Sequence, residues 1–243
     1  MVQSRKVSCT LASLANLPII HERRALALLL ALALAPAWAQ KETAEQKAER
    51  ARAALAEERY EEAATLYQEL VRSDPDNTGL RANLGLVQHA RGQWAKAAEQ
   101  LEIVIKQEPK FAGAWRLLGD CRGKLGQKER AVAALFRATE LEPRDSGTRL
   151  DYASALRAVN RNEDANAEFW RVAQADPQEP RAWHGLVLTN VALARVAKSE
   201  SKRKECWTRA GFAFDQLKET ATGREDLLDE AAKAMKAAPQ EKP

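Results

Sequence analysis

The sequence predicts an all-α protein of stacked helical hairpins, because three kinds of residue recur in a register of 34 positions. Prolines stand at one full period from each other, at Pro75, Pro109, Pro143 and Pro177. Residues that tolerate the left-handed end of a helix share this register, at Gly92, Gly126 and Asn160. So do small residues that let helices approach closely, at Gly85, Gly119, Ala97 and Ala131. A fixed period of roughly 20–50 residues is typical of repeat architectures.

The period divides the chain into four units without gaps, 44–77, 78–111, 112–145 and 146–179. Each unit reads as two helices of roughly 13 residues joined by a short turn. The Gly or Asn marks that turn in three units, whereas the first unit has Glu58 there. The proline ends the second helix, because its ring and its missing N–H prevent continuation.

The third unit shows the clearest motif: Trp115, Leu118, Gly119, Ala131, Leu135 and Pro143. This resembles the tetratricopeptide repeat, with its pattern W-x2-L-G-x2-Y, then A-x3-F, then P. The other units carry parts of this motif. The first unit has Ala63, Tyr67 and Pro75; the second has Leu84, Gly85, Ala97, Leu101 and Pro109; and the fourth has Tyr152, Ala153, Ala165, Phe169 and Pro177. The motif's tyrosine is replaced throughout, by Ala54, Gln88, Arg122 and Leu156. The resemblance implies a right-handed α-α superhelix of about four to five hairpins.

Residues 180–237 are expected to form a divergent fifth hairpin and a capping helix. Trp183 and Leu186 repeat the opening of a unit, with Val187 in place of the glycine. A continuous helix is predicted to about residue 198, a second over 200–217 and a last one over 225–236. A terminal unit with a charged outer face shields the last apolar face of a solenoid. The alternative is that the last helix docks a partner or a second copy. Residues 238–243 are expected to be a disordered tail.

Residues 1–39 read as a secretory signal peptide. Arg23 and Arg24 precede an apolar run over 25–35, and Ala37-Trp38-Ala39 forms a cleavage site of small residues. A helix over that run is roughly 16 Å long at ~1.5 Å per residue, too short for a hydrocarbon core of about 30 Å. The sequence therefore predicts a periplasmic or secreted protein cut after Ala39. An uncleaved amphipathic anchor and a start codon downstream of Met1 remain open.

The charge balance argues against nucleic-acid binding. The chain is formally +4, but residues 1–39 supply four of its 38 basic and one of its 34 acidic residues. The remainder is close to neutral, whereas nucleic-acid binding favours a basic stripe. Beyond the leader, Cys121 and Cys206 are expected to be buried and unpaired, since their separation in a solenoid disfavours a disulfide.

The sequence offers little support for catalysis, a cofactor or a metal. Neither His89 nor His184 has a Cys, Asp or Glu nearby at metal-ligand spacing. There is also no phosphate loop and no nucleophile elbow, so we expect neither an enzyme nor a cofactor-binding protein.

The resemblance implies that the first helix of each hairpin lines a concave groove for a partner protein or peptide. In that register the residues facing inward are Asn83, Leu86, His89, Arg116, Asp120, Lys124, Asp151, Ser154 and Arg157, with His184 extending the row. This lining is polar and mixed in sign. The carboxylate clamp of chaperone-binding relatives is matched only at Asn83, because Ala48, Arg52, Gly113 and Leu117 occupy the other positions.

The sequence thus indicates a non-enzymatic protein-interaction adaptor of the bacterial cell envelope. Two other hypotheses stay open. One is a structural component that self-associates, weakly or through its last helix; the other is an accessory subunit of an envelope enzyme.

Overall fold

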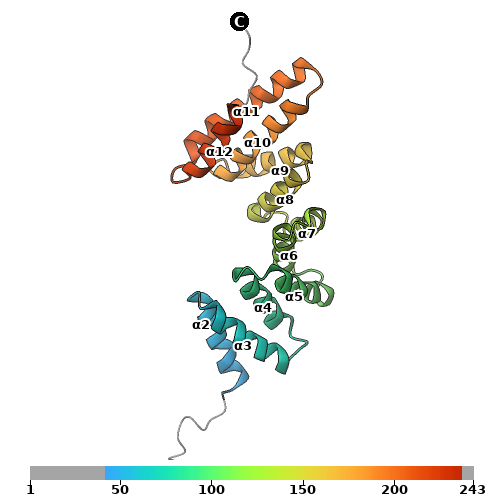
Figure 1. Cartoon of the computed structure of the whole chain (residues 1–243), viewed down its shortest axis with the longest axis vertical. Helices are drawn as coiled ribbons and strands as arrows, with labels where there is room; N and C mark the ends of the chain where they lie inside the picture. Colours follow the sequence, from blue (N-terminus) through green and yellow to red (C-terminus); the bar gives the residue numbers. More distant parts are fainter. Residues whose placement is uncertain (1–41, 237–243) are drawn as a thin grey trace, which may run out of the picture. The chain divides into compact units, whose positions relative to one another are not determined.

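The computed structural model of the chain describes residues 42–236, and the predicted signal peptide and tail lie outside this range. The described residues form helices and connecting turns, without a strand (Figure 1). The helices run α2 (Ala44–Ala56), α3 (Tyr60–Ser73), α4 (Thr78–Ala90), α5 (Trp94–Gln107), α6 (Ala112–Lys124), α7 (Lys128–Leu141), α8 (Ser146–Ala158), α9 (Asn162–Ala175), α10 (Pro180–Val196), α11 (Glu200–Thr220) and α12 (Glu225–Met235). The all-α prediction is confirmed.

From Lys47 onward the described helices belong to one compact unit, and from α3 to α12 each helix packs on its neighbours in sequence. In addition, the first helices of successive hairpins contact one another, α4 with α6, α6 with α8 and α8 with α10. This is the contact pattern of a solenoid, in which each hairpin depends on the next for its apolar contacts.

A turn of three residues joins the two helices of each of the four repeats. Gly92, Gly126 and Asn160 adopt positive φ, and so does Glu58 in the first unit. Four turns therefore share one backbone conformation, although only three carry a residue suited to it. The second helices end at Ser73, Gln107, Leu141 and Ala175, each two residues before the proline.

The carbonyl oxygen of every repeat proline accepts a hydrogen bond from the side chain six residues later. The donors alternate between arginine and tryptophan: Arg81 to Pro75 at 2.6 Å, Trp115 to Pro109 at 2.9 Å, Arg149 to Pro143 at 2.6 Å and Trp183 to Pro177 at 2.8 Å. These bonds tie each connection between hairpins to the first helix that follows it.

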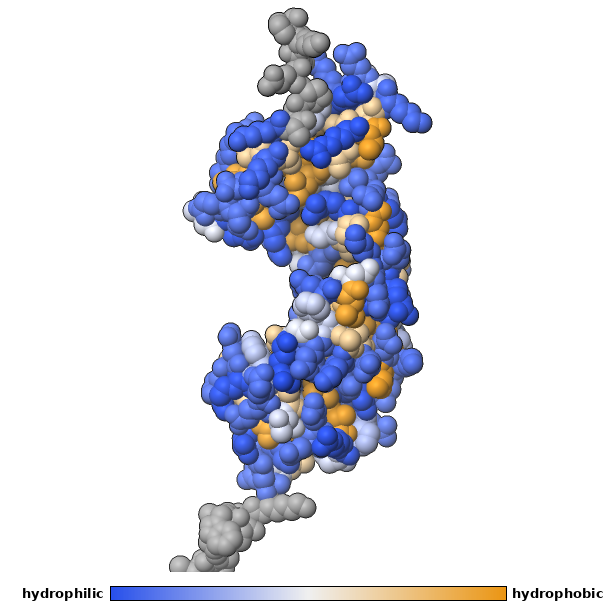
Figure 2. Space-filling view, in the orientation of Figure 1, coloured by the Kyte–Doolittle hydropathy of each residue, from blue (hydrophilic) through white to orange (hydrophobic). Residues whose placement is uncertain are grey.

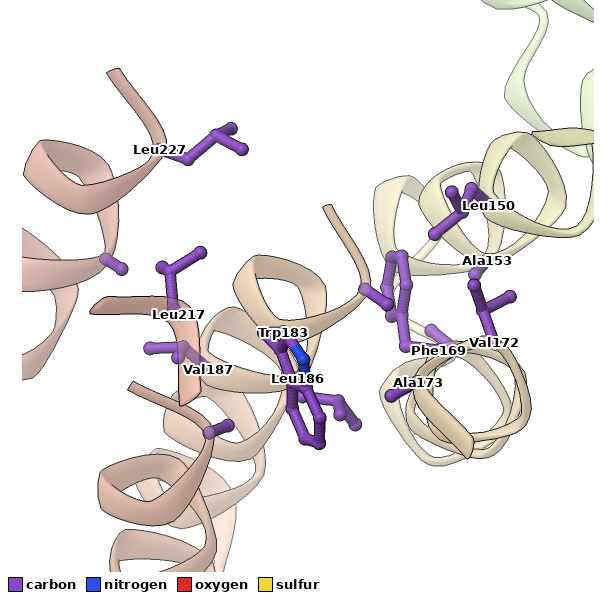
Figure 3. Close-up of a cluster of buried hydrophobic side chains, with 14 of the residues drawn as sticks. Leu150, Ala153, Phe169, Val172, Ala173, Trp183, Leu186, Val187, Leu217 and Leu227 are labelled. Carbon is purple, nitrogen blue, oxygen red and sulfur yellow. The ribbon is translucent and has the colours of Figure 1, made fainter. Parts of the chain in front are cut away.

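Small residues allow the two helices of a hairpin to touch. A Cβ built on Gly119 would lie 2.5 Å from Leu135 Cγ, and one on Gly85 would lie 3.1 Å from Leu101 Cγ. Phe169 needs more room than Leu135, and it fills space beside Gly185, whose added Cβ would meet the ring at 2.5 Å. The ring therefore packs between the fourth and fifth hairpins (Figure 3).

The fifth hairpin leaves the register because Ala194 stands where Gly or Asn closes the earlier turns. Helix α10 continues to Val196 and has 17 residues rather than 13. Ser199 then caps α11, its side chain accepting from Lys202 N at 3.2 Å. Helix α12 packs on α10 and α11 and buries Leu227 and Ala231. Within residues 42–236 no helix is long and apolar enough to cross a membrane.

Candidate partner-binding groove

A pocket of about 560 Å³ opens along the first helices α4, α6 and α8, in the place where the sequence predicts a groove. Its lining includes Asn83, His89, Arg116, Asp120 and Asp151 from the predicted set. We call this pocket the first-helix groove. The one-repeat spacing of α4, α6 and α8 brings residues about 34 positions apart into a single lining.

The first-helix groove has an apolar lining as well as charges. Leu86 is 40% exposed and Phe111 is 37% exposed, and Leu117 lies beside them in the pocket. Phe111 stands at the N-cap of α6 and makes no side-chain cap hydrogen bond, whereas the equivalent residues Asn77, Asp145 and Glu179 all do. A cap is worth about 1 kcal/mol. The aromatic ring at this position therefore has a cost in helix stability.

Gly113 makes room for that ring. A Cβ on Gly113 would lie 3.3 Å from Phe111 Cε2, so the ring lies across the first turn of α6. The expectation of a polar lining was wrong in this respect: the groove presents an apolar surface within a charged frame. Sequence reasoning missed Phe111 because it belongs to the connection between hairpins rather than to a helix face.

Polar contacts between successive hairpins frame the groove. His89 Nε2 lies 2.5 Å from Asp120 Oδ2, and Arg116 Nε donates to Asp151 Oδ2 at 2.8 Å. Arg116 Nη1 also lies 3.6 Å from Asp145 Oδ2. Burial acts to raise the pKa of Asp145, but hydrogen bonds from Thr148 and Gly147 and the nearby Arg116 lower it overall. Arg116 thus holds the third and fourth hairpins together as well as facing the groove.

Three of the remaining predicted residues line a separate, smaller pocket of about 220 Å³ between α8, α10 and the start of α12. It contains Ser154, Arg157 and His184 and shares Asp151 with the first-helix groove. In the part of the chain that the structure describes, Arg157 has no ion pair. Two other arginines at this pocket are paired, Arg181 with Glu179 and Arg224 with Asp226. Lys124 is exposed near the end of α6 and lines neither pocket.

His184 is buried beside α12, and its Nε2 lies 3.3 Å from Glu230 Oε2. Burial lowers the pKa of His184, and Arg157 lowers it further, while Glu230 acts in the opposite direction. The side chain is therefore neutral at pH 7. It belongs to the packing between α10 and α12 more than to an open site.

Neither thiol in the described range is poised for chemistry. Cys121 and Cys206 are both buried and free, as the sequence predicts. Burial and the neighbouring Asp120 carboxylate raise the pKa of the Cys121 thiol to about 11, so it stays protonated at neutral pH. Within residues 42–236, no group of three His, Cys, Asp or Glu side chains is placed to hold a metal ion.

Comparisons with known proteins agree with the repeat register. Two tetratricopeptide repeat family models match the chain, one over residues 54–121 and the other over 112–145. A comparison with curated proteins found no match.

Solved structures share the fold. A MamA protein from Desulfovibrio magneticus superposes with a TM-score of 0.64 at 18% identity, covering 74% of this chain and 98% of that one. YrrB, described as a TPR protein with an unusual peptide-binding site, superposes with a TM-score of 0.63 at 21% identity, covering 80% and 94%. TTC0263 from Thermus thermophilus gives 0.55 at 17% identity, covering 79% and 99%. Residues 54–145 therefore carry tetratricopeptide repeats, and the described chain has the α-α superhelical fold of tetratricopeptide repeat proteins.

Proposed function

We propose that this protein is a non-enzymatic adaptor that binds a segment of another protein in the first-helix groove. The observation that carries the proposal is the exposed pair Leu86 and Phe111, beside polar side chains that include the Arg116–Asp151 ion pair. A pocket with an apolar surface and a few polar groups around it is the usual form of a binding site.

The cost of Phe111 at an N-cap supports a binding role. Local choices that lower stability without a compensating contact are expected at functional sites. A bound apolar side chain would cover the Phe111 and Leu86 surfaces, and the polar frame would set its orientation. The chemistry of the pocket thus favours a segment with one large apolar side chain between polar neighbours.

We further propose that the adaptor works in the bacterial cell envelope. The predicted signal peptide over residues 1–39 supports this location. The way α12 covers α10 and α11 supports a capping role for that helix over docking of a second copy.

Affinity capture with a matched pair of variants tests the groove. Leu86→Gln with Phe111→Asn removes the exposed apolar surface, and Asn at residue 111 supplies the missing cap, so the fold is retained. Val196→Gln removes an equally apolar, exposed side chain outside the groove. Partners quantified from the native host should fall at least roughly tenfold with the double variant and stay unchanged with Val196→Gln. Equal recovery with both would refute groove binding.

A further inference from the structure

Two further pockets lie on second helices of the hairpins, one on α7 and one on α9, and their linings are equivalent. The α7 pocket, about 460 Å³, is lined by α7 residues together with Tyr152, Val159 and Arg161. The α9 pocket, about 670 Å³, is lined by α9 residues together with side chains of α10 and α11. Neither shares a lining residue with the first-helix groove.

The linings correspond position by position after one 34-residue period. Five pairs match, namely Glu129 with Glu163, Val132 with Asn166, Ala133 with Ala167, Phe136 with Trp170 and Tyr152 with Leu186. On each second helix the four residues follow the spacing i, i+3, i+4 and i+7, which places them on one helix face. The repeat thus builds the same kind of site twice in succession.

The first two repeats do not carry this lining. Gln68 and Glu102 occupy the position of the aromatic residue, and Thr65 and Glu99 occupy the position of the alanine. The aromatic and alanine pair is therefore confined to the third and fourth repeats, and is not a general requirement of the hairpin.

Both aromatic side chains are held at the surface. Phe136 is 47% exposed and Trp170 is 42% exposed. Phe136 lies 5.7 Å from Tyr152 between ring centroids, and Trp170 meets Trp183 edge-on at 6.1 Å. Phe212, also exposed, meets the same Trp183 at 5.9 Å and lines the α9 pocket. In the space-filling view hydrophobic residues form separate patches among hydrophilic ones (Figure 2). Exposed aromatic side chains gathered beside a pocket, as Phe136 and Trp170 are, favour an interaction site.

The arginines that line the two pockets form ion pairs within the protein, whereas one glutamate in each pocket does not. Arg161 pairs with Asp164, and Arg209 pairs with Glu205. Glu129 and Glu163 make no ion pair with any residue in the range 42–236. Each pocket therefore has one carboxylate without an ion-pair partner in the described range, and the two carboxylates lie one repeat apart in the sequence.

We propose that the α7 and α9 pockets form a second docking surface, for a basic amphipathic segment of a partner protein. Two large apolar side chains of that segment enter the two pockets and contact Phe136 and Trp170. Lysine or arginine side chains beside them pair with Glu129 and Glu163. This surface is separate from the first-helix groove, so the adaptor can hold two segments at once.

A labelled synthetic helix of Leu and Lys, arranged with one apolar face, is the probe, and the same design with Glu for Lys is its control. Fluorescence anisotropy with residues 42–236 should show that the Lys peptide binds at least roughly tenfold more tightly than the Glu peptide. Phe136→Gln with Trp170→Gln removes both aromatic rings without a change of charge, places the residue of the first repeat at both positions, and should lower affinity roughly tenfold. Glu129→Lys with Glu163→Lys should do the same.

Glu99→Lys is the matched control, because Glu99 is an exposed carboxylate on α5, outside both pockets, and forms no ion pair within the described chain. It should leave affinity unchanged. The proposal is overturned if the Lys peptide fails to bind, if Glu99→Lys weakens it as much as the pocket variants, or if Leu86→Gln with Phe111→Asn abolishes it. Dimerisation that depends on Trp170, measured by sedimentation, would overturn it in favour of a second copy as occupant.

Discussion

The indole Nε1 of Trp115 donates a hydrogen bond to the carbonyl oxygen of Pro109, at 2.9 Å. Trp183 repeats the arrangement with Pro177 two units later. Arg149 donates to the intervening Pro143, and Arg81 donates to Pro75 in the first unit. A carbonyl in a connection between helices has no ladder partner and needs another donor. The indole N–H of a tryptophan or the guanidinium of an arginine reaches this carbonyl from six residues later in the sequence. Trp115 therefore contributes a hydrogen bond as well as apolar contact area.

The two contributions of Trp115 can be separated by substitution. Trp115→Phe keeps the ring contact and loses the hydrogen bond, so it should cost about 1 kcal/mol in the free energy of unfolding. Trp115→Ala also loses the contact, and since the side chain is half-buried it should cost about 2 kcal/mol, below the range for a fully buried tryptophan. Urea titration measures both. Equal costs would show that the ring contact contributes nothing.

The close approach at Gly119 predicts opposite effects for two Gly→Ala substitutions. An alanine at residue 119 would place Cβ 2.5 Å from Leu135 Cγ, which should destabilise the protein by about 1–3 kcal/mol. An alanine at residue 211, inside α11, meets nothing within 4 Å and should stabilise it by about 0.5–1 kcal/mol. Thermal unfolding followed by circular dichroism compares them. The same sign for both variants would contradict the packing described here.

The first turn offers a stabilising substitution. Glu58 adopts φ 58°, a conformation that costs an L-residue other than Gly or Asn about 1–2 kcal/mol. Glu58→Gly should therefore raise the free energy of unfolding by about 0.5–1 kcal/mol. Asn160→Gly, at φ 62°, is the control and should gain less, because Asn tolerates this region. A loss of stability in the Glu58 variant would mean that its side chain makes a contact worth more than the strain.

His184 should make stability depend on pH. Its pKa in the folded chain is lowered, chiefly by burial, so the unfolded chain takes up the proton first as pH falls. Its contribution is complete above the ordinary pKa of about 6.5 and declines as pH decreases below that value. Urea midpoints of the wild type and of His184→Gln should therefore converge between about pH 7 and pH 5. A difference that stays constant would place the pKa of His184 at its ordinary value.

Much of the fold followed from the sequence because the repeat makes each local signal appear several times. Prolines and turn residues in one register identified the hairpins even where the motif tyrosine was absent. The lengthened α10 also follows from a local cause, the Ala194 that replaces a turn residue. The role of Gly185 could not be predicted from its local sequence, because it depends on the size of the Phe169 ring in the preceding hairpin.

The candidate site was only partly predictable. A helical register places Asn83, His89 and Arg116 on inward faces, and the structure brings them into one pocket. That register says nothing of connections, so Phe111 was missed. It also cannot show which charges are already neutralised: Arg116 is paired across hairpins, whereas Arg157 is not. Lys124 lies in the predicted register but near the helix end, beyond both pockets.

Photocrosslinking in the native host can show whether a partner protein occupies the first-helix groove. A benzophenone amino acid at residue 86 lies inside the first-helix groove, and the same amino acid at residue 196 is exposed outside it. We expect a defined partner protein to be joined to residue 86 and not to residue 196, and we expect Phe111→Asn to weaken this product. An identical set of products at the two positions, or none at residue 86, would contradict this expectation.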